Sequence, residues 1–280
     1  MKNDQRLPGR RALLRLVAGL GTAGAVRVIA ADPAGAPARP SESVQAGAAG
    51  PASALRREPS AYRLEPMTAD APPRFRPAAP PVRTQPFERV PEVGHAMVLT
   101  FDDGPDPHHT PRILATLREH DVRAMFFLCG EMAHGNKDLV RAIADDGHTL
   151  GNHSWTHPLV TRLSRAGVRE ELGRTSDVIA SVTGAPPLWY RAPYGAWNRT
   201  SFEIGAELDM EPMAWTVDTL DWTRPGAETI VHRVREGAAP GAVVLSHDAG
   251  GDRSQSVAAL RRYLPDLLDA GYRITVPRRR

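Results

Sequence analysis

The chain has 280 residues, of which 41% are hydrophobic, and its formal net charge is +3. This length allows one large domain with extensions. The single cysteine, Cys129, excludes an intrachain disulfide framework, and no apolar run reaches the ~18 residues of a membrane-spanning helix. Residues 1–94 carry 14 basic and 8 acidic side chains, whereas residues 95–280 carry 21 basic and 24 acidic ones. A folded nucleic-acid-binding domain should itself be basic, so that class of protein is excluded.

The first 31 residues have the pattern of an export signal. Basic side chains precede an apolar run over residues 16–26, and small residues follow it. The adjacent Arg10 and Arg11 resemble those of a twin-arginine signal. We therefore predict export to the cell envelope or the extracellular space. The glycines at positions 19, 21 and 24 match a dinucleotide-binding spacing, but no strand precedes them, so we expect no nucleotide cofactor.

Residues 32–94 are rich in Pro and Ala and have no sustained apolar period. Thirteen of the 26 prolines lie between positions 33 and 91. Each proline removes a backbone donor and disfavours helix in the residue before it. Such a segment buries too little surface to offset its conformational entropy. We predict a disordered linker that leads to a folded domain over residues 95–280.

Short apolar, β-rich runs alternate with amphipathic patterns from residue 95 onward. The runs predict strands over residues 97–101, 124–128, 148–151, 188–191, 213–217, 242–246 and 273–276. The amphipathic patterns predict one helix starting at residue 111, one ending at residue 147, and others over residues 168–182, 201–208, 228–236 and 256–268. This alternation favours an α/β fold with a parallel sheet closed, or nearly closed, into a barrel. Such a barrel carries its chemistry at the carboxyl ends of its strands.

Chemically competent side chains follow five of these predicted strands. His153 and His157, with a carboxylate from elsewhere, form the three-ligand set of a catalytic zinc site, although two such histidines also occur by chance. Asp102 and Asp103 end a strand, where adjacent side chains point in opposite directions. His247 ends a buried strand and could act as a general acid or be a hydrogen-bonded structural residue.

These segments resemble, in order and spacing, the motifs of the polysaccharide deacetylase family with the NodB homology domain, also called carbohydrate esterase family 4. The resemblance covers residues 95–276. The motifs are Thr100-Phe101-Asp102-Asp103-Gly104, His153-Ser154-x-x-His157, Arg191-x-Pro193-Tyr194-Gly195, Asp218-x-x-Asp221-Trp222 and Leu245-x-His247. The family's fold implies a distorted (β/α) barrel of about seven strands.

The resemblance also implies a metal centre with a general base beside it. Asp103, His153 and His157 would bind one divalent ion, for which we predict Zn²⁺, with Co²⁺ or Mn²⁺ compatible with the same ligands. Asp102 would be the base that takes a proton from the attacking water. Arg191 would hold Asp102 by a charge-assisted pair and keep it ionised.

The remaining motif residues would serve the leaving group and the substrate. His247 would protonate the departing amine, and Asp221 would orient and charge-stabilise that imidazole. The backbone N–H of Tyr194 would stabilise the oxyanion. Trp222 and Leu245 would line a pocket for the acetyl methyl group.

The resemblance predicts a hydrolase that removes N-acetyl groups from N-acetylglucosamine units of a peptidoglycan or chitin-type glycan. Two other functions stay open from the sequence: an O-acetyl esterase acting on a xylan-like polysaccharide, and a non-catalytic glycan-binding module. We expect an acetylated glycan as the partner and a monomeric protein.

Overall fold

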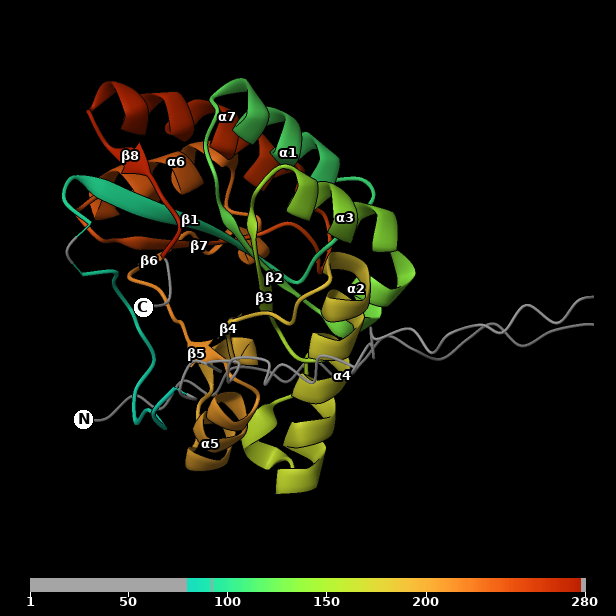
Figure 1. Ribbon diagram of the computed structural model, residues 1–280. Coiled ribbons are helices and arrows are strands. Elements are labelled where there is room, and N and C mark those ends of the chain that lie inside the picture. Colours follow the sequence, from blue (N-terminus) through green and yellow to red (C-terminus); the bar gives the residue numbers. More distant parts are fainter. Residues whose placement is uncertain (1–79, 92, 278–280) are drawn as a thin grey trace, which may run out of the picture. The chain divides into compact units, whose positions relative to one another are not determined.

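The computed structural model describes residues 80–91 and 93–277 (Figure 1). The predicted export signal and most of the predicted linker lie outside these residues. A curled parallel sheet forms the centre of the domain. Its strands are β1 (Ala96–Asp102), β2 (Met125–Leu128), β3 (Thr149–Asn152), β4 (Trp189–Tyr190), β5 (Glu211–Pro212), β6 (Val217–Asp218), β7 (Val243–His247) and β8 (Arg273–Ile274).

The strands lie in the order β5-β4-β3-β2-β1-β7-β6, and β8 pairs with the beginning of β1. This arrangement confirms the predicted distorted barrel. Helices follow the strands and cover the outside of the curled sheet (Figure 1). They are α1 (Thr110–Glu119), α2 (Gly130–Gly135), α3 (Lys137–Asp145), α4 (Arg165–Thr183), α5 (Arg199–Glu207), α6 (Ala227–Gly237) and α7 (Ser254–Asp269). None of the described helices is long and apolar enough to cross a membrane.

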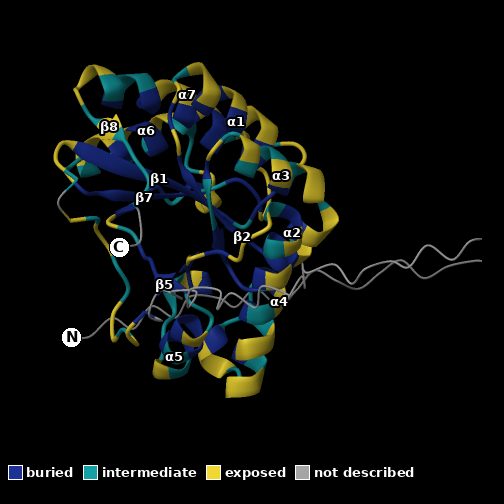
Figure 2. Cartoon of the chain, viewed as in Figure 1, coloured by how far each residue is buried: buried dark blue, intermediate teal, exposed yellow. Residues whose placement is uncertain are grey.

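Strand β1 is buried along its whole length, as Figure 2 shows in dark blue. Leu99 and Phe101 pack in the core shared with the covering helices, whereas Val98 packs in the barrel interior. Burying each such side chain stabilises the fold by roughly 1.5–3 kcal/mol. Because side chains alternate along a strand, Thr100 and Asp102 follow Val98 on the inner face. The interior therefore changes from apolar to polar toward the carboxyl end of the sheet.

The predicted strand over residues 213–217 is wrong, because this segment crosses between the two edges of the sheet. β5 ends at Pro212 and pairs with β4, whereas β6 begins at Val217 and pairs with β7. The carbonyls of Met213 and Ala214 accept hydrogen bonds from Arg191, at 3.1 Å from Nε and 2.8 Å from Nη2. A buried guanidinium therefore takes the carbonyls that a continuous strand would use.

The predicted linker boundary at residue 94 also differs from the structure, since residues 83–90 pack on the barrel. Arg83 forms two 2.9 Å hydrogen bonds with Glu211. Phe87 bridges to Met213 and its ring meets Trp189 edge to face. The backbone N–H of Val90 donates to the Gly241 carbonyl at 2.9 Å. This short strap runs from the β5 edge of the sheet to the residues just before β7.

Removal of residues 1–94 should therefore destabilise the domain more than removal of residues 1–79, because only the longer deletion removes the strap. The longer deletion loses the Phe87 packing and the Arg83 pair, a change of roughly 1–3 kcal/mol. For a domain of this size each kcal/mol lowers the melting temperature by about 2–4 °C. Thermal unfolding of the two truncated proteins measures the difference. Equal melting temperatures would show that the strap contributes nothing to stability.

Candidate active site and metal centre

The side chains predicted to carry the chemistry gather at the carboxyl end of the curled sheet. Strands β1, β3, β4 and β7 end at or just before one of them, and the 3₁₀ turn Asp221–Thr223 follows β6. Parallel strands put these ends on the same rim. The structure brings together there Asp102, Asp103, His153, His157, Arg191, Asp221 and His247.

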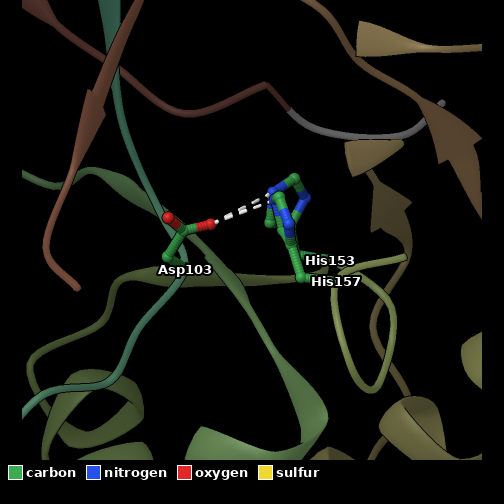
Figure 3. Close-up of side chains that lie close together, drawn as sticks. All are labelled: Asp103, His153 and His157. Carbon is green, nitrogen blue, oxygen red and sulfur yellow. Dashed lines mark ion pairs between the residues drawn. The ribbon is translucent and has the colours of Figure 1, made fainter. Parts of the chain in front are cut away.

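Asp103, His153 and His157 form a compact group of three ligand atoms that lie within 4.8 Å of one another. Figure 3 shows both imidazoles facing one oxygen of Asp103. That Oδ1 lies 3.5 Å from His153 Nε2 and 3.4 Å from His157 Nε2, too far for strong hydrogen bonds. Ligands about 2.0–2.1 Å from one tetrahedral zinc would be about 3.3–3.4 Å apart. The spacing therefore fits a divalent cation.

Two further observations support this fit. Asp103 Oδ1 is buried and has no hydrogen-bond partner among the described residues. His153 Nδ1 lies 2.8 Å from the Arg191 carbonyl, which can only accept, so Nδ1 carries the proton and Nε2 keeps its lone pair. Burial lowers the pKa of His153 to about 3, although Asp103 opposes the shift. The imidazole is therefore neutral and able to bind a metal at neutral pH.

Several residues of the rim have left-handed backbone conformations that non-glycine residues rarely adopt. Asp103 has φ 76°, His157 has φ 56° and Tyr194 has φ 62°. Asp tolerates this region better than most residues. Left-handed non-glycine residues concentrate at functional sites, where the surrounding structure holds them in place. Here the turn at Asp103 directs its carboxylate differently from that of Asp102.

Asp102 and Arg191 form a fully buried ion pair. Arg191 Nη1 donates to Asp102 Oδ1 at 2.7 Å and to Thr100 Oγ1 at 2.8 Å. The predicted contact is present, and Arg191 favours the ionised form of Asp102 as expected, but burial decides the net direction of the pKa shift. Burial raises the pKa of this carboxyl, and the guanidinium only opposes the rise. The other oxygen, Oδ2, lies 3.7 Å from His153 Nε2.

His247 and Asp221 form a second pair. His247 Nδ1 lies 2.6 Å from Asp221 Oδ1, while Asp221 Oδ2 accepts from the His247 backbone N–H at 2.9 Å and from Ser256 Oγ at 2.6 Å. Burial opposes the charged imidazole, but the bond and charge of Asp221 raise the pKa of His247 to about 9. The imidazole is therefore protonated at neutral pH.

The three predicted substrate-contact residues occupy different positions. Tyr194 is 67% exposed, and its ring meets the imidazole of His157 edge to face. Trp222 follows Asp221 in the 3₁₀ turn and is 45% exposed. Leu245 is 4% exposed and shares the inner face of β7 with His247. Their contribution to substrate binding stays a prediction.

Sequence reasoning missed four polar residues that support the rim. Ser256, at the start of α7, donates to Asp221. Thr110 donates to the buried Asp248, which directly follows His247. Glu171, in α4, accepts from the loop that joins His153 to His157. The position of Asp248 at a strand end was a usable signal, but Ser256 and Glu171 lie within helical patterns that give none.

Comparisons with known proteins agree on one family. The model of the family described as polysaccharide deacetylase matches residues 90–213. A peptidoglycan-N-acetylglucosamine deacetylase of Bacillus cereus is 37% identical over 183 residues, which are 65% of this chain and 66% of that protein. A chitooligosaccharide deacetylase of Rhizobium leguminosarum bv. trifolii is 36% identical over 198 residues, which are 67% of this chain and 92% of that protein.

One of the solved structures that this chain resembles belongs to a protein without the family's activity. The CE4 family pseudoenzyme of Bacillus anthracis is 32% identical, with a TM-score of 0.64, and the match covers 69% of this chain and 67% of that one. The same fold can therefore lack the activity. Any functional conclusion depends on the residues at the rim.

Proposed function

The chain belongs to the polysaccharide deacetylase family, and we propose that it is a metal-dependent hydrolase that removes N-acetyl groups from glycans. The substrate that we propose is a polymer containing N-acetylglucosamine, either peptidoglycan or a chitin-type chain. The two relatives described above are deacetylases named for such glycans. The proposed substrate class is based on these two relatives. The proposed chemistry is based on the residues of this chain.

One observation carries the proposal: a base and an acid lie side by side on neighbouring strands, next to the triad formed by Asp103, His153 and His157. Asp102 ends β1, His247 ends β7, and the two residues are paired in the strand register. Amide hydrolysis needs a proton removed from water and a proton given to the leaving amine. A carboxylate and a protonated imidazole on either side of the acetyl group would perform these two transfers.

Asp102 would accept the proton of the attacking water. Its Oδ1 is engaged by Arg191, and its Oδ2 lies near the triad. Arg191 would hold the carboxylate in one orientation. Its positive charge would also stabilise the ionised form of Asp102 against burial, which raises the pKa of that carboxyl. The guanidinium has no freedom to move, because two carbonyls and Thr100 also accept from it.

His247 would donate the proton to the departing amine. Its Nδ1 is bonded to Asp221, so the proton on Nε2 is the one available to the substrate. Asp221 would keep the imidazole protonated and oriented until the carbon–nitrogen bond breaks. Ser256 in turn fixes the second oxygen of Asp221.

Asp103, His153 and His157 would hold one divalent ion, and we propose Zn²⁺. The ion would supply a Lewis acid that polarises the acetyl carbonyl and makes water a better nucleophile. The backbone N–H of Tyr194 would donate to the oxyanion that develops. Trp222 and Leu245 would enclose the acetyl methyl group.

Chelation should abolish acetate release from chitooligosaccharides and peptidoglycan, and added Zn²⁺ should restore it. His153→Ala should lose both the bound ion and the activity, because it removes one of three protein ligands. We would measure acetate enzymatically and metal content by elemental analysis of the same samples. Undiminished activity in a chelated, metal-free sample would refute the metal-dependent reaction.

The same assay separates the competing functions. Release from acetylxylan but not from N-acetylated glycans would identify an O-acetyl esterase. Glycan binding without acetate release from any substrate would identify a non-catalytic glycan-binding module. The intact triad, base and acid argue against that second outcome.

A further inference from the structure

A glutamate outside the five motifs holds the loop between the two histidines of the triad. We propose that Glu171, in α4, is a positioning residue that sets the metal affinity of the triad by fixing residues 154–156. This inference rests on the proposed function, since it takes Asp103, His153 and His157 as the metal ligands. Glu171 itself would touch neither the ion nor the substrate.

The carboxylate of Glu171 accepts three hydrogen bonds from two successive residues of the loop. Its Oε2 accepts from the backbone N–H of Trp155 and of Thr156, both at 2.8 Å. Its Oε1 accepts from the Thr156 hydroxyl at 2.9 Å. Hydrogen bonds to an ionised acceptor are roughly twice as strong as neutral ones. A single charged side chain of helix α4 therefore fixes the middle of the loop by hydrogen bonds.

The carbonyls of the loop are held from the opposite side by the start of α2. The backbone N–H of Gly130 donates to Ser154 at 2.9 Å, and that of Glu131 donates to Trp155 at 3.2 Å. The backbone of Gly130 lies so close to the Trp155 ring that a Cβ added to Gly130 would lie 2.2 Å from it. The loop thus receives donors from α2 and gives its own donors to Glu171.

The loop needs such external bonds because its backbone is strained at both ends. Ser154 has φ 66° and His157 has φ 56°. Left-handed conformations of non-glycine residues persist only where the surroundings enforce them. A loop without the Glu171 contacts would be free to relax toward ordinary backbone angles, and the second imidazole would move with it.

The two ligands differ in how much they depend on the loop. The side chain of His153 is only 3% exposed, and its Nδ1 bonds the Arg191 carbonyl. The side chain of His157 is 28% exposed and contacts Asp103 and the ring of Tyr194. His157 follows Thr156 directly, so its position depends most on the bonds that Glu171 accepts.

Removal of these bonds should weaken metal binding in proportion to the number removed. Glu171→Ala should lower the Zn²⁺ affinity by roughly 10–100-fold, the usual range for residues that orient metal ligands. Glu171→Gln keeps the length but replaces one accepting oxygen with an NH₂ group, so its loss should be smaller. Thr156→Val removes only the hydroxyl bond and should have the smallest effect.

The experiment is a competition titration of the full chain, freed of metal, with Zn²⁺ and a chromophoric chelator. Glu170→Gln is the matched control, since the side chain of the neighbouring Glu170 is 70% exposed and forms a long 3.8 Å pair with Arg174. Circular dichroism and thermal unfolding of the metal-free proteins report folding separately. Turnover at saturating Zn²⁺ completes the set, because a residue that acts only on stability would leave the affinity of the folded protein unchanged.

The outcomes separate this inference from the proposed function. No Zn²⁺ binding by the unsubstituted chain would refute the metal site itself. Zn²⁺ binding of normal affinity in folded Glu171→Gln and Thr156→Val would overturn the role of Glu171 and leave the proposed function standing. A graded loss of affinity, with Glu170→Gln unaffected, would establish the positioning role. Should Glu171→Ala fail to fold, the two milder variants decide the question in the same way.

Discussion

Asp102→Asn should lower turnover by ~10²–10⁴-fold while the protein keeps its metal. The amide has nearly the size of the carboxylate, and its oxygen can still accept the 2.7 Å hydrogen bond from Arg191. What it loses is the ability to accept a proton from water. Acetate release under saturating substrate gives the turnover, and elemental analysis gives the metal content.

Stability must be measured beside activity in this variant. Arg191 is fully buried, and removal of the carboxylate of Asp102, with which it is paired, leaves an uncompensated charge. Breaking a buried pair in this way costs about 3–5 kcal/mol. Thermal unfolding therefore shows whether the assay temperature lies safely below the transition, so that a loss of fold is not mistaken for a loss of the base.

Asp103→Ala provides the contrast. It removes the oxygen that both imidazoles face, so metal affinity itself should fall. The adjacent acids should thus fail differently, one by losing proton transfer and the other by losing the ion. Equal loss of metal in both variants would contradict the division of roles between them.

Much of the rim could be predicted because each motif lies at the end of a short apolar run. His247 follows Leu245 and Ser246 in such a run, and Asp102 follows Phe101. Parallel strands then place all such ends on one side of the barrel, so local patterns imply the long-range arrangement. The rule does not say which strands are neighbours, so the pairing of Asp102 with His247 across β1 and β7 is known only from the structure.

The features that could not be predicted depend on tertiary contacts of single side chains. Arg191 interrupts the expected strand by donating to the carbonyls of Met213 and Ala214. The residue types in this segment give no sign of such a contact. Phe87 lies in a proline-rich segment, yet it packs against Trp189. The pKa of Asp102 rises because burial outweighs a partner that the motif did suggest. In the sequence, Glu171 cannot be distinguished from the other polar residues of its amphipathic helix.

The pH dependence of the reaction should have an alkaline limb set by His247. The imidazole must be protonated to donate to the leaving amine, and its pKa is raised from 6.5 to about 9 in spite of burial. Activity should therefore fall as the pH rises through about 9. The acidic limb should report the protonation of Asp102 together with the water that it activates, which kinetics alone cannot separate.

Removal of the partner should move that alkaline limb. In Asp221→Asn the imidazole keeps its burial, which lowers its pKa, but loses the opposing carboxylate, so the limb should shift to lower pH by roughly 1–3 units. Ser256→Ala removes only one bond to Asp221 and should shift the limb less, in the same direction. Metal content should be unchanged in both variants. An alkaline limb at the same pH in Asp221→Asn would contradict the assignment of His247 as the acid.

The same pair makes a stability prediction that is independent of catalysis. The pKa of His247 is raised in the folded state, so its contribution is fully present below about 6.5 and is lost as the pH rises through about 9. The pKa of Asp221 is lowered because the bonds from His247 outweigh the effect of burial, so its contribution is lost only as the pH falls below 3.8. The free energy of unfolding should therefore decline between pH 6.5 and 9 in the unsubstituted chain. Denaturant titrations at these two pH values should show a smaller decline in Asp221→Asn, because the pKa of the unpartnered imidazole then lies closer to its unfolded value of 6.5.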